Sequence, residues 1–169
     1  MTPTRPVVAH EPLPKEIPAF EPEFIQGLTE LFEHKIVFNQ LLGLKVVSVQ
    51  AHEVKACIHM RPELVGHFSH NRVHGGVISA ALDALGGLAV MAAIGARHMD
   101  EAPQQRLQRF AKLGTIDLRI DYLRPGISDH IELSAEVLRL GSRVASTRMA
   151  FHGAGDKLLA VGSAAYIVS

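Results

Sequence analysis

Hydrophobic residues occupy almost every position of one segment of this chain. From Val77 to Ala96 every residue is Gly, Ala, Val, Ile, Leu or Met, except Ser79 and Asp83. A helix with apolar residues on every side belongs in a protein core. Ionised carboxylates are rare in such surroundings unless they are paired or hydrogen-bonded. Asp83 is therefore a candidate functional group, and capping of a neighbouring backbone or emergence of the helix at the surface are the structural alternatives.

A second pattern, the alternation of apolar and polar residues, predicts β-strands. Two such runs precede the apolar helix and four follow it, over residues 44–52, 54–61, 116–122, 131–137, 145–151 and 158–168. Turn residues, among them Gly126 and Gly141, separate the last four runs. Strict alternation over consecutive runs indicates an antiparallel sheet with one buried face.

The N-terminal third has a different pattern. Residues 1–22 are punctuated by prolines, which predicts an extended arm. Apolar residues at helical spacing predict an amphipathic helix from Phe24 to Leu42, with Gly43 as its stop. We therefore predict an N-terminal extension over 1–22 and one folded domain over 23–169. Within the domain, a polar loop over 63–73 and a polar insert over 97–112 flank the apolar helix.

These elements combine in one simple way. The apolar helix needs cover on all sides, and the sheet needs cover on its apolar face, so the sheet should wrap around the helix. The order of one helix, two strands, a central helix and four strands is the plan of an α+β hotdog domain. One copy would leave part of the central helix bare, so we expect a homo-oligomer, a dimer or a tetramer.

Composition narrows the class of protein. The 17 basic and 17 acidic residues cancel, so the chain lacks the basic footprint of a nucleic-acid-binding protein. Its single cysteine, Cys57, cannot form an internal disulfide, lies in a strand-like run and suits a reducing compartment. No signal-peptide pattern is visible. The run 77–96 is long enough to span a membrane, but Asp83, the many small residues and the flanking strands favour a cytoplasmic protein without a membrane segment.

Two motifs resemble those of a known family. His74, Gly75 and Gly76 stand in a row with Asp83 nine positions after the histidine, and a later strand ends in Tyr-Leu-Arg-Pro-Gly at 122–126. Over roughly residues 38–169 the chain resembles the PaaI-like hotdog acyl-CoA thioesterases. The resemblance implies hydrolysis of an acyl-CoA thioester to a free acid and coenzyme A. It also implies an active site at a dimer interface, with no metal or organic cofactor.

The spacing of these residues has a physical meaning of its own. Gly75 and Gly76 would open the helix, where amide N–H groups lack helical partners and the helix dipole favours negative charge. Such amides suit a thioester oxygen that gains charge during attack, and glycine lets the substrate approach closely. Asp83 lies seven residues beyond Gly76, about 10 Å along the axis. One thioester carbon cannot contact both groups on one helix, whereas two helices related by a two-fold axis would allow it.

The resemblance also suggests roles for individual residues. In the family the aspartate, here Asp83, acts as general base on water or as nucleophile, and the sequence leaves both routes open. Thr115 would hold the water, although a β-branched residue is also ordinary in a strand. His74 would sit at the start of the helix, with its ring free to support the loop or the thioester pocket.

Two loop positions depart from the family pattern. His67 stands where relatives commonly carry asparagine, and we predict that it positions water or substrate. Asn71 replaces a frequent glycine, and asparagine tolerates the left-handed backbone that such a turn needs.

Two further sets of residues could bind ligands. Arg124 and Arg143 are candidates for contacts with the coenzyme A nucleotide, although exposed arginines more often serve a solvated strand face. The histidines His67, His70 and His74 could suggest zinc, but no cysteine or nearby carboxylate completes a ligand set, so no metal is predicted. Two other functions remain open: a hotdog hydratase or dehydratase acting on acyl thioesters, and a non-catalytic acyl-CoA binding or sensing module.

Overall fold

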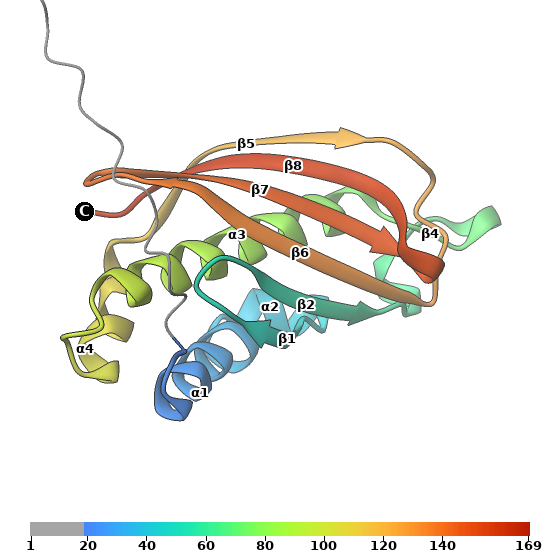
Figure 1. Ribbon diagram of the computed structural model, residues 1–169. Coiled ribbons are helices and arrows are strands. Elements are labelled where there is room, and N and C mark those ends of the chain that lie inside the picture. Colours follow the sequence, from blue (N-terminus) through green and yellow to red (C-terminus); the bar gives the residue numbers. More distant parts are fainter. Residues whose placement is uncertain (1–18) are drawn as a thin grey trace, which may run out of the picture.

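The computed structural model describes residues 19–169, so most of the predicted N-terminal extension, 1–22, lies outside the described residues. A curved antiparallel sheet of six strands packs over one long helix, α3 (Gly75–Arg97), as Figure 1 shows. The strands follow the order β1-β2-β6-β7-β8-β5. Their bounds are β1 Lys45–Val49, β2 Val54–His59, β5 Gly114–Tyr122, β6 His130–Leu140, β7 Val144–Gly153 and β8 Lys157–Ile167. The α+β hotdog fold and all six predicted strands are confirmed.

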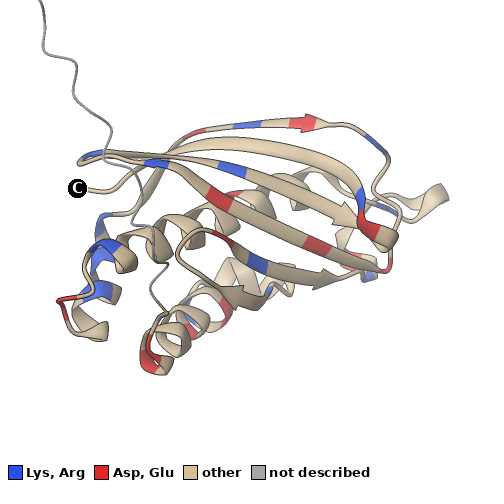
Figure 2. Cartoon of the chain, viewed as in Figure 1, with Lys and Arg blue, Asp and Glu red and all other residues tan. Residues whose placement is uncertain are grey.

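The core lies between the sheet and α3. On β6, Ile131, Leu133 and Ala135 are buried and alternate with polar residues on the outer face. On β8 the inward positions 160, 162 and 164 carry small residues, and a Cβ on Gly162 would lie 2.9 Å from Met149 and 3.3 Å from Leu82. Small residues on this strand therefore let the helix approach the sheet closely. Figure 2 shows charged residues on the outer face of the sheet and around its ends, and few along α3.

The helix α3 is long and apolar enough to cross a membrane by length and composition. Within the protein, 72% of its most apolar window is buried. Packing against the sheet accounts for that composition, as expected of a core helix.

The predicted helix 24–42 is interrupted. The structure has α1 (Pro22–Glu30), a π-helical turn over Leu31–Lys35 and α2 (Val37–Leu42), with Ile36 in an extended conformation between them. Side chains stabilise the break: the Asn39 amide donates to the Phe32 carbonyl at 2.9 Å. The carboxylate of Glu33 accepts hydrogen bonds from strand β1, at 2.7 Å from the Val46 N–H and 2.8 Å from Lys45 Nζ. Apolar periodicity continues through such a break, which is why the sequence pattern did not indicate it.

Two segments predicted as irregular contain regular structure. The loop 63–73 folds into a hairpin of β3 (Val65–His67) and β4 (Arg72–Val73), with 3₁₀ turns at Pro62–Leu64 and Phe68–His70. The insert 97–112 forms α4 (Pro103–Gln108) and a 3₁₀ turn over Arg109–Lys112. A last 3₁₀ turn, Ala154–Asp156, joins β7 to β8. The insert packs against α1 and covers the C-terminal end of α3.

Candidate active site

The start of α3 is capped by a histidine side chain. His74 adopts an extended conformation, and its Nδ1 accepts a hydrogen bond from the Gly76 N–H at 2.8 Å. An imidazole whose Nδ1 accepts carries its proton on Nε2. Within residues 19–169 the Gly75 N–H has no hydrogen-bond partner. The structure thus leaves Gly75 as the free donor at this helix start, while the Gly76 amide serves the cap.

The second sequence motif lies directly on the helix start. The Tyr122 hydroxyl donates to the Gly75 carbonyl at 3.0 Å. Gly126 packs so closely on Val73 that a Cβ there would lie 2.2 Å from the valine side chain, and its carbonyl accepts from the Val73 N–H at 2.8 Å. A pocket of about 390 Å³ opens between the two motifs, lined by Gly75, Tyr122 and Arg124 among others. The fold therefore brings together His74–Gly76 and 122–126, which are remote in sequence.

Asp83 lies on α3 with hydroxyl groups beside it. Thr115, at the start of β5, donates to Asp83 Oδ1 at 2.8 Å. The Tyr166 hydroxyl, from β8, donates to the Asp83 backbone carbonyl at 2.8 Å and lies 3.4 Å from Oδ1. Burial raises the pKa of the Tyr166 phenol well above its ordinary value, and the Asp83 carboxylate raises it further. Tyr166 therefore remains a hydrogen-bond donor beside this carboxylate.

The surface around Asp83 is partly open. The C-terminal half of α3 is covered, with Phe24 packed at Gly95 and Phe32 near Gly87. The N-terminal half has an uncovered stripe, which we call the open stripe. Its members are half-buried or exposed, and all but the aspartate are small: Gly76, Ser79, Ala80, Asp83 and Ala84. Asp83 is consequently half-buried in a single copy of the chain, at the one charged position of that stripe.

The two parts of the candidate site are separated along one continuous helix. Gly76 and Asp83 both belong to α3 and are seven residues apart, about 10 Å along the axis. A thioester that contacts Asp83 therefore lies out of reach of the helix start of the same copy. The distance that the sequence predicted is thus present in the structure.

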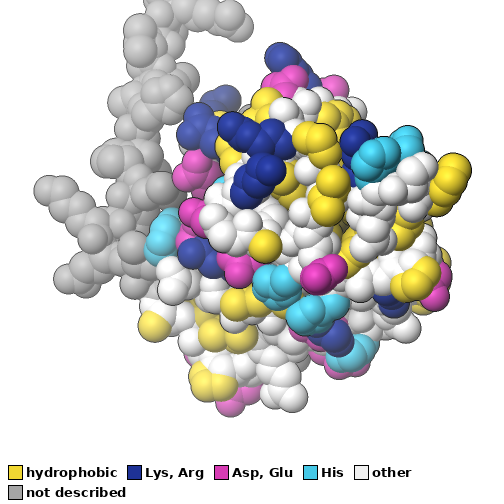
Figure 3. Space-filling view, turned by 90° about the vertical axis from the view of Figure 1, so that its right-hand side faces the viewer, with side chains coloured by type: hydrophobic (Ala, Val, Ile, Leu, Met, Phe, Trp, Pro, Cys, Tyr) yellow, Lys and Arg dark blue, Asp and Glu magenta, His cyan; other side chains and the backbone are white. Residues whose placement is uncertain are grey.

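The hairpin before α3 presents the two departures from the family pattern. Asn71 has φ +45°, so its predicted left-handed conformation is confirmed. His67 is exposed and contacts His70, with 3.4 Å between the two Nδ1 atoms, and it stacks on Phe68. Phe68 itself is 93% exposed, and Figure 3 shows hydrophobic side chains and histidines gathered on this end of the molecule. The role predicted for His67 in holding water or substrate stays a prediction, and His74 faces Gly76 rather than the other two histidines.

The two predicted nucleotide contacts lie at opposite ends of the sheet. Arg124 Nη1 donates to the Leu158 carbonyl at 2.8 Å, and the Arg143 carbonyl accepts from the Val168 N–H at 2.9 Å. Leu158 and Val168 are ten residues apart along β8 and its end, which corresponds to about 33 Å. A single copy of the chain therefore does not bring Arg124 and Arg143 to one ligand.

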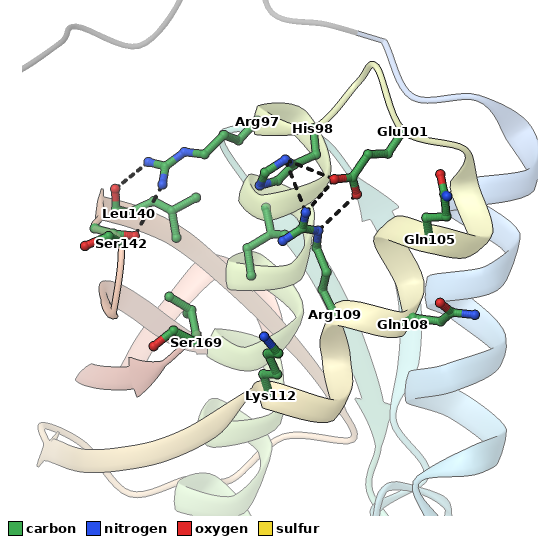
Figure 4. A pocket seen from close by; sticks show the side chains of 13 residues that line it. Arg97, His98, Glu101, Gln105, Gln108, Arg109, Lys112, Leu140, Ser142 and Ser169 are labelled. Carbon is green, nitrogen blue, oxygen red and sulfur yellow. Dashed lines mark hydrogen bonds and ion pairs between the residues drawn. The ribbon is translucent and has the colours of Figure 1, made fainter.

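A cleft of about 660 Å³ lies at the Arg143 end, between the end of α3, the insert and the β6–β7 turn (Figure 4). Arg97 spans the cleft and donates to the carbonyls of Leu140 and Gly141. Arg109 pairs with Glu101, with 3.0 Å between Nε and Oε2, and Lys112 lines the same space. Sequence reasoning did not single out these three cations, because a polar composition does not indicate which side chains of the insert line one cleft.

The fold and this arrangement define a class of protein: a hotdog domain with a carboxylate in mid-helix and a glycine pair at the start of that helix. The family model of the thioesterase superfamily matches residues 70–160, which include both motifs. The chain belongs to this superfamily.

Individual relatives agree with that assignment. The chain is 34% identical over 139 residues to the medium/long-chain acyl-CoA thioesterase YigI of Salmonella typhimurium, covering 82% of this chain and 90% of the relative. The Escherichia coli K12 protein of the same name is 33% identical over the same length. Among solved structures, a Shewanella oneidensis protein related to the thioesterase superfamily superimposes with a TM-score of 0.82 at 36% identity. That match covers 87% of this chain and 96% of the other.

Proposed function

We propose that this protein is an acyl-CoA thioesterase that hydrolyses medium- or long-chain acyl-CoA to the free acid and coenzyme A. The observation that carries the proposal is the Asp83 carboxylate, held by Thr115 at 2.8 Å on the open stripe of α3. At the start of the same helix the Gly75 N–H has no partner among residues 19–169. The similarity to YigI, a medium/long-chain acyl-CoA thioesterase, supports the proposed length of the acyl group.

The chemistry follows from the two groups. Asp83 either removes a proton from water that attacks the thioester carbon, or attacks that carbon itself to form an anhydride that water then hydrolyses. In both routes the carbonyl oxygen gains negative charge. The Gly75 N–H and the positive end of the α3 dipole would stabilise that charge. Collapse of the tetrahedral species expels the coenzyme A thiolate.

We further propose that two copies of the chain form each site. Two features support a dimer. The open stripe offers a surface of small residues on which a second α3 could pack closely. Strand β5 stands at the edge of the six-stranded sheet beside β8, and its Ile116 is 58% exposed. A two-fold axis near the open stripe would bring the helix start of one copy to the Asp83 of the other, which resolves the separation of about 10 Å within one helix.

For the coenzyme A nucleotide, we propose the cleft beside Arg143. Lys112 lines this cleft and is three residues before Thr115, which corresponds to about 10 Å along an extended chain. The pantetheine arm could bridge such a distance from Asp83. Arginine and lysine are suited to phosphate groups through charge-assisted hydrogen bonds. Arg124 would instead flank the helix start, where it lines the smaller pocket.

Thiol release from a panel of acyl-CoA substrates, from short to long and aryl chains, tests the proposed function. We expect turnover that is highest for medium or long chains. Asp83→Asn, which keeps the size of the side chain, should lower kcat at least about a thousand-fold while the oligomer persists. Crotonyl-CoA hydration is the control for a hydratase. Tight acyl-CoA binding without turnover would instead identify a non-catalytic binding module.

A further inference from the structure

We infer that Tyr166 is a positioning residue for Asp83: together with Thr115 it holds Oδ1 and the backbone of the aspartate, so that Oδ2 is the reacting oxygen. This inference rests on the proposed thioesterase function and adds a residue and an atom to it. It concerns the side of Asp83 that faces the sheet, whereas the substrate would approach from the open stripe.

The contacts around the carboxylate are one-sided. Oδ1 accepts from Thr115 at 2.8 Å and has the Tyr166 hydroxyl at 3.4 Å. Within residues 19–169, no donor lies within hydrogen-bond distance of Oδ2. A carboxylate oxygen that already accepts hydrogen bonds is a poorer base and nucleophile than its unpartnered neighbour. The asymmetry therefore selects Oδ2 for attack or for proton removal.

The stronger of the two Tyr166 contacts is to the main chain. Its hydroxyl lies 2.8 Å from the Asp83 carbonyl oxygen, and the residue is only 1% exposed. A tyrosine buried to this extent normally satisfies its hydroxyl with a partner, and here that partner is the backbone of the catalytic position. This hydrogen bond holds α3 at a fixed distance from β8 at Asp83, the residue whose side chain would react.

Helix α3 has a glycine, Gly86, at the position that faces this hydroxyl. A Cβ on Gly86 would lie 2.2 Å from the Tyr166 hydroxyl oxygen and 2.8 Å from Met149 Sδ. Any side chain at position 86 would therefore displace the phenol from Asp83. Because Gly86 has no side chain, the Tyr166 ring has room to place its hydroxyl beside Asp83. The Thr147 hydroxyl contacts the same Met149 Sδ at 3.2 Å.

The functional consequence is orientation. Reacting atoms must be held near van der Waals contact in a fixed direction, and small displacements are costly for rate. The Thr115 hydroxyl holds the carboxylate at Oδ1, and the Tyr166 hydroxyl holds the Asp83 backbone and lies near the same oxygen. The absence of a side chain at Gly86 leaves room for the Tyr166 hydroxyl. Loss of the Tyr166 hydroxyl should therefore lower the rate of the chemical step without weakening substrate binding.

The test is steady-state kinetics of Tyr166→Phe, Thr115→Val and the double variant on the best substrate of the wild type. We expect Tyr166→Phe to lower kcat roughly ten-fold and to change KM by less than about two-fold. The double variant should lose less than the product of the two single losses, because both hydroxyls hold the same aspartate. Phe151→Leu is the packing control, since Phe151 is buried on β7 and pairs with Ala160, six positions along β8 from Tyr166.

Each outcome has a distinct meaning. A kcat loss in Tyr166→Phe at unchanged KM, absent from Phe151→Leu at equal loss of thermal stability, supports the inference. An unchanged kcat in Tyr166→Phe, or an equal kcat loss in Phe151→Leu, overturns it while the thioesterase function stands. Absence of turnover in the wild type on every substrate overturns both.

Discussion

The imidazole of His74 determines which backbone N–H groups at the start of α3 can bind a ligand. Its Nδ1 accepts from the Gly76 N–H at 2.8 Å, which satisfies one of the unpaired donors of the first turn. The β3–β4 hairpin packs closely against this histidine: a Cβ on Gly66 would lie 2.6 Å from the His74 Cα. The cap therefore fixes the direction in which the neighbouring Gly75 N–H points. A ligand oxygen at the helix start meets a donor that is already oriented.

We predict that His74→Ala destabilises the protein by about 1 kcal/mol, since it removes an N-cap acceptor. His74→Asn should retain most of the stability, because asparagine is a favourable N-cap residue. Urea unfolding followed by circular dichroism measures both. Equal stability of the alanine variant and the wild type would show that the cap contributes nothing to α3.

Sequence reasoning found the residues whose chemistry stands out and missed those whose role depends on packing. Asp83 was conspicuous as a carboxylate in an apolar run, and its contact with Thr115 is present in the structure. Tyr166 was not singled out, because a tyrosine on an alternating strand is typical of an ordinary core position. The available signal was the row of small inward residues before it on β8, which indicates close approach of the helix. Which atom the phenol contacts depends on the strand order and on Gly86.

At the scale of elements, the insert holds the N-terminal helix to the core helix. Arg106 of α4 is fully buried and lies over the Phe24 ring of α1, with its guanidinium carbon 4.4 Å from the centroid. Its Nη2 lies 2.5 Å from Glu21 Oε2, and its Nη1 donates to the Gly95 carbonyl at the end of α3. A run of polar residues is typical of an exposed segment, so the pattern over 97–112 could not indicate that Arg106 is buried. The break at Ile36 escaped prediction for a related reason, because side-chain hydrogen bonds stabilise it.

The Glu21–Arg106 pair should make stability depend on pH. The hydrogen bond from Arg106 lowers the pKa of the Glu21 carboxyl below its ordinary value. A carboxyl with a lowered pKa in the folded state contributes stability above its unfolded pKa and loses it as the pH falls through the folded value. We therefore expect Glu21→Gln to be less stable than the wild type at pH 7, with the difference shrinking below about pH 4.5.

Urea unfolding at pH 7 and pH 3.5 measures this, and Glu23→Gln, two positions along on α1, is the matched control. A stability difference between Glu21→Gln and the wild type that is the same at both pH values would contradict the assignment.

The insert also forms one wall of the cationic cleft beside Arg143, so its second predicted contribution is to substrate binding. We expect Lys112→Ala and Arg143→Ala each to raise KM for an acyl-CoA several-fold to about ten-fold, with kcat little changed, because each removes a charge-assisted contact. The same acyl group on pantetheine, which lacks the nucleotide, should show no such change. A loss of equal size on both substrates would exclude the cleft as the nucleotide site.

At the scale of the whole molecule, one copy of the chain contains both halves of a site but holds them apart. Asp83 and the helix start belong to the same rigid helix, so no loop movement can bring them together. The six-stranded sheet ends at β5, and the open stripe lies near that edge, because Thr115 of β5 contacts Asp83. A second copy related by a two-fold axis would cover the stripe and complete two sites at once.

Complementation between two inactive variants tests this arrangement. Asp83→Asn removes the carboxylate, and Gly75→Val obstructs the helix start beside the Tyr122 ring, which lies 3.5 Å from the Cβ position. If each site takes Asp83 from one copy and Gly75 from the other, a hybrid dimer contains one doubly altered site and one intact site. Random mixing makes half of the dimers hybrids with one of two sites working, so we expect about a quarter of the wild-type activity. Sites formed within a single copy would give no recovery, provided that sedimentation shows both variants to be dimers.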